Sequence, residues 1–176
     1  MTAPVWLFGY GSLMWDGWET RFGCLTRRAA VAPSHGRIFN KKSLERWGTY
    51  ARPGLTLNLT PSGSCHGVAF EFPGTGQTQI EDYLCERETC AATDISVHLP
   101  DRTVLARTYI YDGPRLVEDG LPLHRRAAMV LEAEGIAGLS YDYIRCVRTH
   151  LVDLGVEDPA VQALWTAVVA LEGKQE

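Results

Sequence analysis

The sequence predicts an α+β protein in which an antiparallel β-meander with one short inserted helix is followed by a helical last third. Two observations lead to this prediction. Residues 55–111 contain four short runs in which apolar and polar residues alternate, as in half-buried strands. Residues 123–168 instead place apolar side chains at helical spacing. No linker, internal repeat or low-complexity segment interrupts the chain, so we expect one domain over residues 1–176.

Composition narrows the class of protein. The chain has 176 residues, of which 45% are hydrophobic, and it can bury a sizeable core. The net charge of −4 and the scattered Lys and Arg residues argue against a nucleic-acid partner. No apolar run approaches the roughly 20 residues of a membrane span, and Met1–Pro4 lack the features of a signal peptide. We therefore expect a cytoplasmic protein without a membrane partner.

The first predicted element is a buried strand, Val5–Phe8, that runs into the glycine-rich loop Gly9-Tyr10-Gly11-Ser12. A strand followed by such a loop presents several backbone N–H groups in one place, a nest that suits a carboxylate or a phosphate. Residues 16–26 show no clear periodicity and are interpreted as a loop with one helical turn.

Extended segments are expected next at residues 27–32 and 37–39, separated by Pro33 and Gly36. Residues 40–53 are polar and contain turn signals, so we interpret them as a long loop. Loops of this length are uncommon in compact domains unless they act as lids or binding loops.

The middle of the chain predicts two strand pairs around a helix. Residues 55–59 and 68–72 alternate on either side of a Pro-Ser-Gly-Ser turn, which predicts a hairpin. Residues 95–99 and 104–111 predict a second antiparallel pair. Between the pairs, residues 79–88 repeat apolar side chains at helical spacing.

Three helices are expected in the last third of the chain. The first covers residues 123–131. Ser140 can cap the second, which Gly155 closes, and Asp158 with Pro159 predicts the N-cap and first turn of the third.

The inserted helix carries the main candidate for catalysis. Ile80, Leu84 and Glu88 lie at i, i+4 and i+8, so a carboxylate ends the apolar stripe that faces the sheet. One interpretation is structural: Glu88 pairs with Arg87 or with a distant Arg, or the helix frays before it. The other is functional: a carboxylate shielded from water transfers protons. A nest for an anion and a proton-transfer group together fit an intramolecular acyl transfer that needs no metal and no nucleophilic side chain.

Other groups of residues give weaker predictions of function. The Gly9-x-Gly11-Ser12 pattern lacks the third glycine and the βαβ context of a nucleotide loop. The five cysteines are irregularly spaced and are interpreted as reduced thiols; Cys65, Cys85 and Cys90 lack the close pairs of a zinc site. A cysteine nucleophile paired with a histidine stays open, the candidate histidines being His35, His98 and His150.

Two motifs resemble a known family. Phe8–Trp15 resembles the opening signature FGYGSL(I/M)W of the ChaC-type γ-glutamylcyclotransferases, and Tyr83–Glu88 resembles the family's Y-L-x-x-R-E. Similar segments occur in the family's order over nearly the whole chain: residues 37–39, Ser43, Gly48, 52–54, 67–70, 141–143 and 154–159. The chain departs from the family after Glu88, where Thr89–Ala92 replace Lys-x-Gly-Tyr.

The resemblance implies an α+β fold with a mixed, mostly antiparallel small β-barrel or sheet, a short inserted helix and C-terminal helices. It also implies an enzyme that needs no cofactor and cleaves a γ-glutamyl amide, such as glutathione, to 5-oxoproline and a free amine such as Cys-Gly. Glu88 would be the catalytic residue. The substrate-binding residues would be Tyr10, Gly11, Ser12, Leu13, Ser43 and Tyr109. For Tyr109 a packing role in the core stays equally open, because an alternating strand commonly contains a tyrosine. The alternative is a non-catalytic module that binds a γ-glutamyl or other small carboxylate ligand on the same fold.

Overall fold

The structure is a computed structural model that describes residues 3–173, and it divides into two compact units. The first unit combines the chain up to residue 36 with residues 59–112, and the second combines residues 37–58 with residues from 113 onward. Met1 and Thr2, on which the expected absence of a signal peptide partly rests, lie outside the described residues. The expectation of a single domain stays a prediction.

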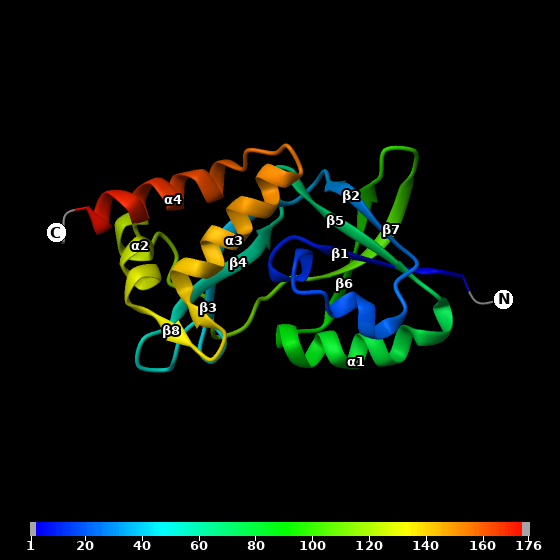
Figure 1. The fold of residues 1–176 in the computed structure, drawn as a ribbon, viewed down its shortest axis with the longest axis horizontal. Coiled ribbons are helices and arrows are strands. Elements are labelled where there is room, and N and C mark those ends of the chain that lie inside the picture. The colour runs from blue at the N-terminus through cyan, green and yellow to red at the C-terminus, as the bar shows by residue number, and fades with distance from the viewer. Residues whose placement is uncertain (1–2, 174–176) are drawn as a thin grey trace. The chain divides into compact units, whose positions relative to one another are not determined.

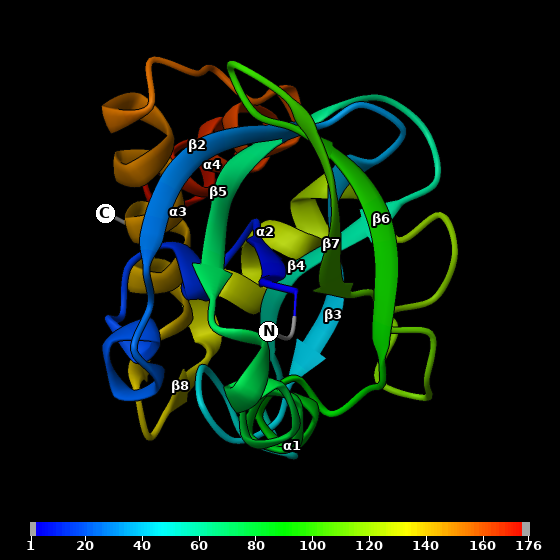
Figure 2. The ribbon, with the colours of Figure 1, turned by 90° about the vertical axis from the view of Figure 1, so that its right-hand side faces the viewer.

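The first unit is a closed five-stranded barrel. Its strand order is β1-β5-β2-β6-β7, and all neighbours are antiparallel except β1 and β7, which run parallel with Leu7 beside Arg107. Figure 2 shows β2, β5, β6 and β7 curving around the barrel. The strands are β1 (Val5–Gly9), β2 (Thr26–Ala32), β5 (Cys65–Phe72), β6 (Ala92–His98) and β7 (Thr103–Tyr109).

Fully buried aromatic side chains of β1 and β5 cover both faces of the barrel wall. Phe8 lies on one face, opposite Ala69, and Phe70 and Phe72 lie on the other, where Trp18 packs against both rings. Gly67 of β5 allows the two strands to approach closely where β1 ends. A Cβ atom at this position would lie 2.4 Å from the Gly9 carbonyl oxygen and 2.8 Å from the Phe8 ring. A side chain at residue 67 would therefore push β1 and the loop that follows it out of place.

Two short 3₁₀ turns and one helix complete the first unit. The 3₁₀ turns Ser12–Met14 and Trp18–Phe22 follow β1, and a third, Gly74–Gly76, leads into α1 (Gln77–Glu88). Helix α1, at the bottom of Figure 2, buries Ile80 and Leu84 completely, as their spacing predicts. Thr89, the C-cap residue that follows the helix, is a non-glycine residue with a positive φ of 60°.

The second unit combines two two-stranded sheets, β3 with β4 and β8 with β9, with three helices (Figure 1). The helices pack against one another, and α3 buries apolar side chains at helical spacing, namely Tyr143, Ile144, Val147 and Leu151. The elements are β3 (Gly36–Ser43), β4 (Gly54–Thr60), α2 (Leu123–Glu132), β8 (Glu134–Gly135), β9 (Gly138–Leu139), α3 (Ser140–Asp153) and α4 (Pro159–Glu172).

The sequence predicts the N-caps of the last two helices, and one of these predictions is confirmed and the other is wrong. The Asp158 carboxylate accepts hydrogen bonds from the N–H groups of Ala160 and Val161, so the predicted N-cap is confirmed. The same carboxylate forms a buried ion pair with Arg37 at 3.0 Å. Ser140 is not a cap: it is the first residue of α3, and its hydroxyl instead accepts a hydrogen bond from Leu55 N–H.

The predicted elements are largely confirmed, but the predicted meander is wrong. The runs at residues 55–59 and 68–72 are strands, yet β4 pairs with β3, whereas β5 lies between β1 and β2. Successive strands here are therefore not neighbours, and residues 55–72 do not form a hairpin. The α+β class with a mixed, mostly antiparallel small barrel is confirmed.

The predicted loop at residues 40–53 is shorter than expected, because β3 continues to Ser43. These polar residues are ordered by a segment distant in sequence: Lys42 N–H donates to the Arg115 carbonyl, and Val117 N–H donates to the Asn40 carbonyl. A polar edge strand of this kind gives no apolar alternation from which it could be predicted.

No helix within residues 3–173 combines the length and the apolar character that crossing a bilayer requires. None of the five cysteines, all of them described, takes part in a disulfide. Across residues 3–173, His, Cys, Asp and Glu side chains form no group of three or more that could hold a metal ion.

Candidate active site

The loop after β1 leaves backbone donors outside its own hydrogen-bond pattern. The first bond of its 3₁₀ turn runs from Met14 N–H to the Gly11 carbonyl at 2.9 Å. Because that bond begins at the third residue of the turn, the N–H groups of Ser12 and Leu13 have no acceptor within it. The carbonyls of Leu13 and Met14 are engaged, by Trp18 Nε1 at 3.0 Å and by the Arg27 guanidinium respectively.

Two side-chain hydrogen bonds fix the start of this loop to β7. The Tyr10 hydroxyl donates to the Tyr109 carbonyl at 2.6 Å, and the Thr108 hydroxyl donates to the Phe8 carbonyl at 3.0 Å. Both bonds are buried. The Tyr10 hydroxyl therefore has a structural partner, and its predicted contact with substrate stays a prediction.

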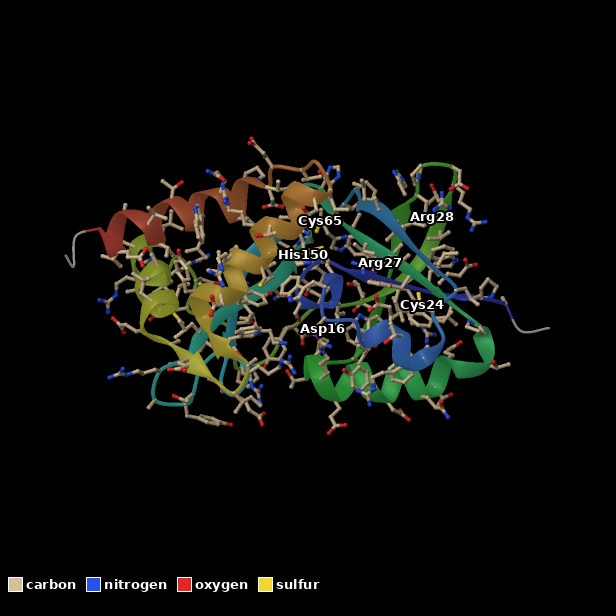
Figure 3. All side chains as sticks on the ribbon, viewed as in Figure 1. Asp16, Cys24, Arg27, Arg28, Cys65 and His150 are labelled. Carbon is tan, nitrogen blue, oxygen red and sulfur yellow. The ribbon has the colours of Figure 1, made fainter. Side chains whose placement is uncertain are left out.

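Arg87, in the last turn of α1, joins the loop to the helix. Its side chain is 7% exposed, and its guanidinium lies 2.5 Å from the carboxylate of Asp16, a residue of the loop after β1 that is labelled in Figure 3. Nη2 also donates to the Ser12 hydroxyl at 3.1 Å. Burial disfavours the charged form, but the hydrogen bond and charge of Asp16, with the charge of Glu88, raise the pKa of Arg87 above its ordinary value.

Glu88, the predicted catalytic residue, is the last residue of α1. Its side chain is 21% exposed, and Oε1 lies 3.4 Å from Arg87 Nε. The pairing with Arg87 that the structural interpretation expects is thus present. That pairing leaves a partly shielded carboxylate at the end of the buried Ile80–Leu84 stripe, where a substrate could still reach it.

Tyr109, at the end of β7, presents a buried hydroxyl toward α1. The residue is 2% exposed, and this hydroxyl has no hydrogen-bond partner of normal geometry among residues 3–173. Burial, the neighbouring Cys85 thiol and the charge of Glu88 raise the pKa of Tyr109, against an opposing effect of Arg107. A buried hydroxyl without a partner is uncommon in proteins and is available to a ligand or a water molecule.

The first unit therefore brings together most of the predicted site residues. Arg87 connects Ser12 to Glu88, and the Tyr10 hydroxyl connects the loop to Tyr109. Ser43 belongs to the second unit, where its hydroxyl accepts a hydrogen bond from Trp47 N–H at 3.0 Å. Its predicted contact with substrate is not tested by this arrangement.

Sequence reasoning gave no site role to Arg87, Asp16 or Cys85. From the sequence, Arg87 is a candidate ion-pair partner of Glu88 and the arginine of the Y-L-x-x-R-E motif, and neither observation predicts its contacts with Ser12 and Asp16. The position of Asp16 gave no signal, because the loop after β1 has no periodicity. Cys85 faces Tyr109 one turn before Glu88, and helical spacing from Glu88 could have indicated it.

Comparison with known proteins identifies the family. The family model described as "ChaC-like protein" matches residues 5–171. A protein of Escherichia coli (strain K12) named "Glutathione-specific gamma-glutamylcyclotransferase" is 31% identical over 177 residues, covering 96% of this chain and 74% of that protein. A protein of Schizosaccharomyces pombe with the same name is 27% identical over 179 residues, covering 85% of each chain.

A solved structure is similar in fold. The crystal structure of a γ-glutamyl cyclotransferase specific to glutathione from yeast matches with a TM-score of 0.85 at 20% identity, covering 96% of this chain and 97% of that one. Because the family model spans nearly the whole chain and the Escherichia coli relative is 31% identical, the chain belongs to the ChaC-like protein family.

Proposed function

We propose that this protein is a γ-glutamylcyclotransferase that cleaves glutathione or a related γ-glutamyl peptide to 5-oxoproline and a free amine, Cys-Gly in the case of glutathione. Its membership of the ChaC-like family and the names of its relatives support an enzyme of this type. The observation that carries the residue roles is the buried Arg87 guanidinium, which contacts both the loop after β1 and Glu88.

The reaction closes a five-membered ring within one substrate molecule. The α-amine attacks the γ-carbonyl carbon, a new C–N bond forms, and the bond from that carbon to the leaving nitrogen breaks. Glu88 takes one proton from the α-ammonium group and returns it to the leaving nitrogen. The second proton that the ring nitrogen loses after the attack ends on the released amine, which leaves as an ammonium group, so the protons balance and water is not consumed. Correct orientation of such an intramolecular attack can supply on the order of 7–11 kcal/mol of the acceleration.

The loop after β1 binds the substrate. The backbone N–H groups of Gly11, Ser12 and Leu13 hold the α-carboxylate of the γ-glutamyl group, as a nest of amides suits an anion. Tyr10 lines the pocket with its ring. The Tyr109 hydroxyl is buried beside the Cys85 thiol and has a raised pKa, so it stays protonated and is a donor for an oxygen of the bound substrate.

The predicted substrate contact of Ser43, a residue of the second unit, rests only on its correspondence with the family's serine and stays a prediction.

The charge of Glu88 distinguishes an enzyme from a binding module. Glu88 argues for catalysis over simple binding, because a carboxylate beside an anion-binding loop weakens the binding of an anionic ligand. A binding module without activity is therefore the less favoured function.

Replacing Glu88 with Gln tests the proton-transfer role. We expect the variant to release 5-oxoproline from glutathione at least about 100-fold more slowly than the wild type, because Gln cannot accept a proton. Glu86→Gln is the matched control: it changes an exposed carboxylate of the same helix and should leave the rate unchanged. Circular dichroism and thermal melting establish that both variants fold.

The outcomes separate the two functions. A folded Glu88→Gln variant with wild-type activity would show that this residue is not catalytic. A wild-type protein that binds glutathione in calorimetry but releases no 5-oxoproline from any of a panel of γ-glutamyl peptides would be the binding module instead.

A further inference from the structure

We propose that Arg87 is a positioning residue that holds the substrate-binding loop and the proton-transfer carboxylate in a fixed mutual arrangement. This inference rests on the proposed cyclotransferase function. It assigns to one side chain the task of keeping the amides that bind the α-carboxylate at a constant distance from the group that removes the proton.

The contacts of Arg87 reach two segments that are distant in sequence. One side of the guanidinium meets the loop after β1, with Nη2 at 3.1 Å from the Ser12 hydroxyl and 2.5 Å from the Asp16 carboxylate. The other nitrogens stay on α1, with Nη1 at 3.4 Å from the Tyr83 hydroxyl and Nε at 3.4 Å from Glu88. A planar guanidinium fixes the directions of its donors, which an ammonium group does not do.

Burial restricts the positions that the Arg87 side chain can adopt. The Arg87 side chain is 7% exposed, whereas the arginine of another ion pair in the same unit, Arg28 with Asp101, is 30% exposed. A buried charge is stable only when it is paired and hydrogen-bonded, so Arg87 has few alternative positions. Because the guanidinium cannot move far, the groups that it contacts are held with it.

The two carboxylates beside Arg87 have different tasks. Asp16 is the closer, at 2.5 Å, and supplies the counter-charge that keeps Arg87 buried and charged. Glu88 is farther away, at 3.4 Å. When Glu88 binds a proton during the reaction and loses its charge, Arg87 keeps Asp16 as its ion-pair partner. The scaffold therefore does not depend on the protonation state of Glu88.

Substitution of Arg87 separates positioning from folding. At a temperature where every variant is folded, we expect Arg87→Met to lower kcat/KM for 5-oxoproline release from glutathione by about 100-fold, the effect of an ångström-scale misplacement. The loss should appear both as a raised KM, from the displaced loop, and as a lowered kcat, from the displaced carboxylate. Arg87→Lys keeps the charge but not the planar fork. It should recover most of the melting temperature while kcat/KM stays at least about 10-fold below the wild type.

Two further variants keep the proposal testable if Arg87→Met does not fold. Ser12→Ala removes one of the two contacts between Arg87 and the loop, leaves the ion pair with Asp16, and should raise KM several-fold while kcat stays near the wild-type value. Asp16→Asn removes the counter-charge, and its effect on kcat/KM should not add to that of Arg87→Lys, because both act through one network. Arg28→Met is the control. Arg28 lies on β2, away from Asp16 in Figure 3, so the variant loses only the ion pair with Asp101 and should keep the wild-type kcat and KM.

The result that overturns the positioning role is distinct from the failure of the proposed function. If the wild type releases 5-oxoproline and Glu88→Gln does not, yet folded Arg87→Met and Arg87→Lys both keep wild-type kcat and KM, Arg87 has only a structural role. Full activity in Arg87→Lys alone would show that charge suffices and that the planar fork positions nothing. A wild type without activity on any γ-glutamyl peptide overturns the function and this inference together.

Discussion

The Tyr109 hydroxyl stays protonated where an ordinary tyrosine would ionise. Burial, Cys85 and the charge of Glu88 raise its pKa, so the native state holds this proton more tightly than the unfolded chain does. The stability contributed by this group is therefore fully present below the ordinary tyrosine pKa of about 10 and is lost as pH rises beyond it.

This linkage predicts a difference between wild type and Tyr109→Phe in alkaline solution. Above about pH 10 the wild type should lose stability more steeply than the variant, by up to about 1.4 kcal/mol per pH unit. Urea unfolding at pH 9, 10 and 11 measures the two slopes. Tyr50→Phe is the control, because that side chain is 81% exposed and stays in water in both states. Parallel slopes for wild type and Tyr109→Phe would show that the hydroxyl is not held in its protonated form.

At the level of single residues, the sequence predicts those that follow a regular spacing. Glu88 was found because it ends a helical stripe, and the structure puts it at the end of the buried residues Ile80 and Leu84. Arg87 was found only as a neighbour of Glu88, because its contacts with Ser12 and Asp16 cross between segments about 70 residues apart. No periodicity within α1 carries information about such contacts.

At the level of elements, the end of α1 stores strain next to the proposed catalytic residue. Thr89 has a φ of 60°, a left-handed conformation that is unusual for a β-branched residue. The conformation costs a residue with a side chain roughly 1–2 kcal/mol, whereas glycine adopts it without that cost. Such positions commonly lie beside functional groups, and this one directly follows Glu88.

We therefore expect Thr89→Gly to stabilise the protein by about 1 kcal/mol, after the larger unfolded-state entropy of glycine is subtracted. Thermal melting should show a rise of about 2–4 °C for a chain of this size. Thr149→Gly provides the contrast: this residue lies inside α3, and glycine should lower the melting temperature there. A Thr89→Gly variant no more stable than the wild type would refute the account of strain.

Strand pairing is the part of the fold that sequence pattern could not predict. The alternation at residues 55–59 and 68–72 identifies both strands, but not that β5 lies between β1 and β2 while β4 pairs with β3. Pairing depends on contacts distant in sequence, and alternation reports only which face of a strand is buried. Asp158 was predictable as a cap because its partners Ala160 and Val161 lie within one turn. The role of Ser140 was not predictable, because its hydroxyl accepts a hydrogen bond from Leu55 N–H, 85 residues away in the sequence.

At the level of the whole molecule, the chain contributes two separate stretches to each compact unit. The first two changes from one unit to the other, near residues 36 and 58, fall inside β3 and β4 and not in a polar linker. Composition marks a boundary only where a Pro-, Gly- or Ser-rich segment separates units, so these boundaries leave no trace in the sequence. The α+β class was predictable because it depends only on the order and type of elements.

The central claim is that the γ-glutamyl amide is cleaved by its own α-amine and not by water. Glutathione incubated with the wild-type protein in ¹⁸O-labelled water tests this directly by mass spectrometry of the products. We expect unlabelled 5-oxoproline in equal amount to Cys-Gly, because no step adds an oxygen from water. Free glutamate with ¹⁸O in its side-chain carboxylate would contradict the claim and identify the protein as a hydrolase.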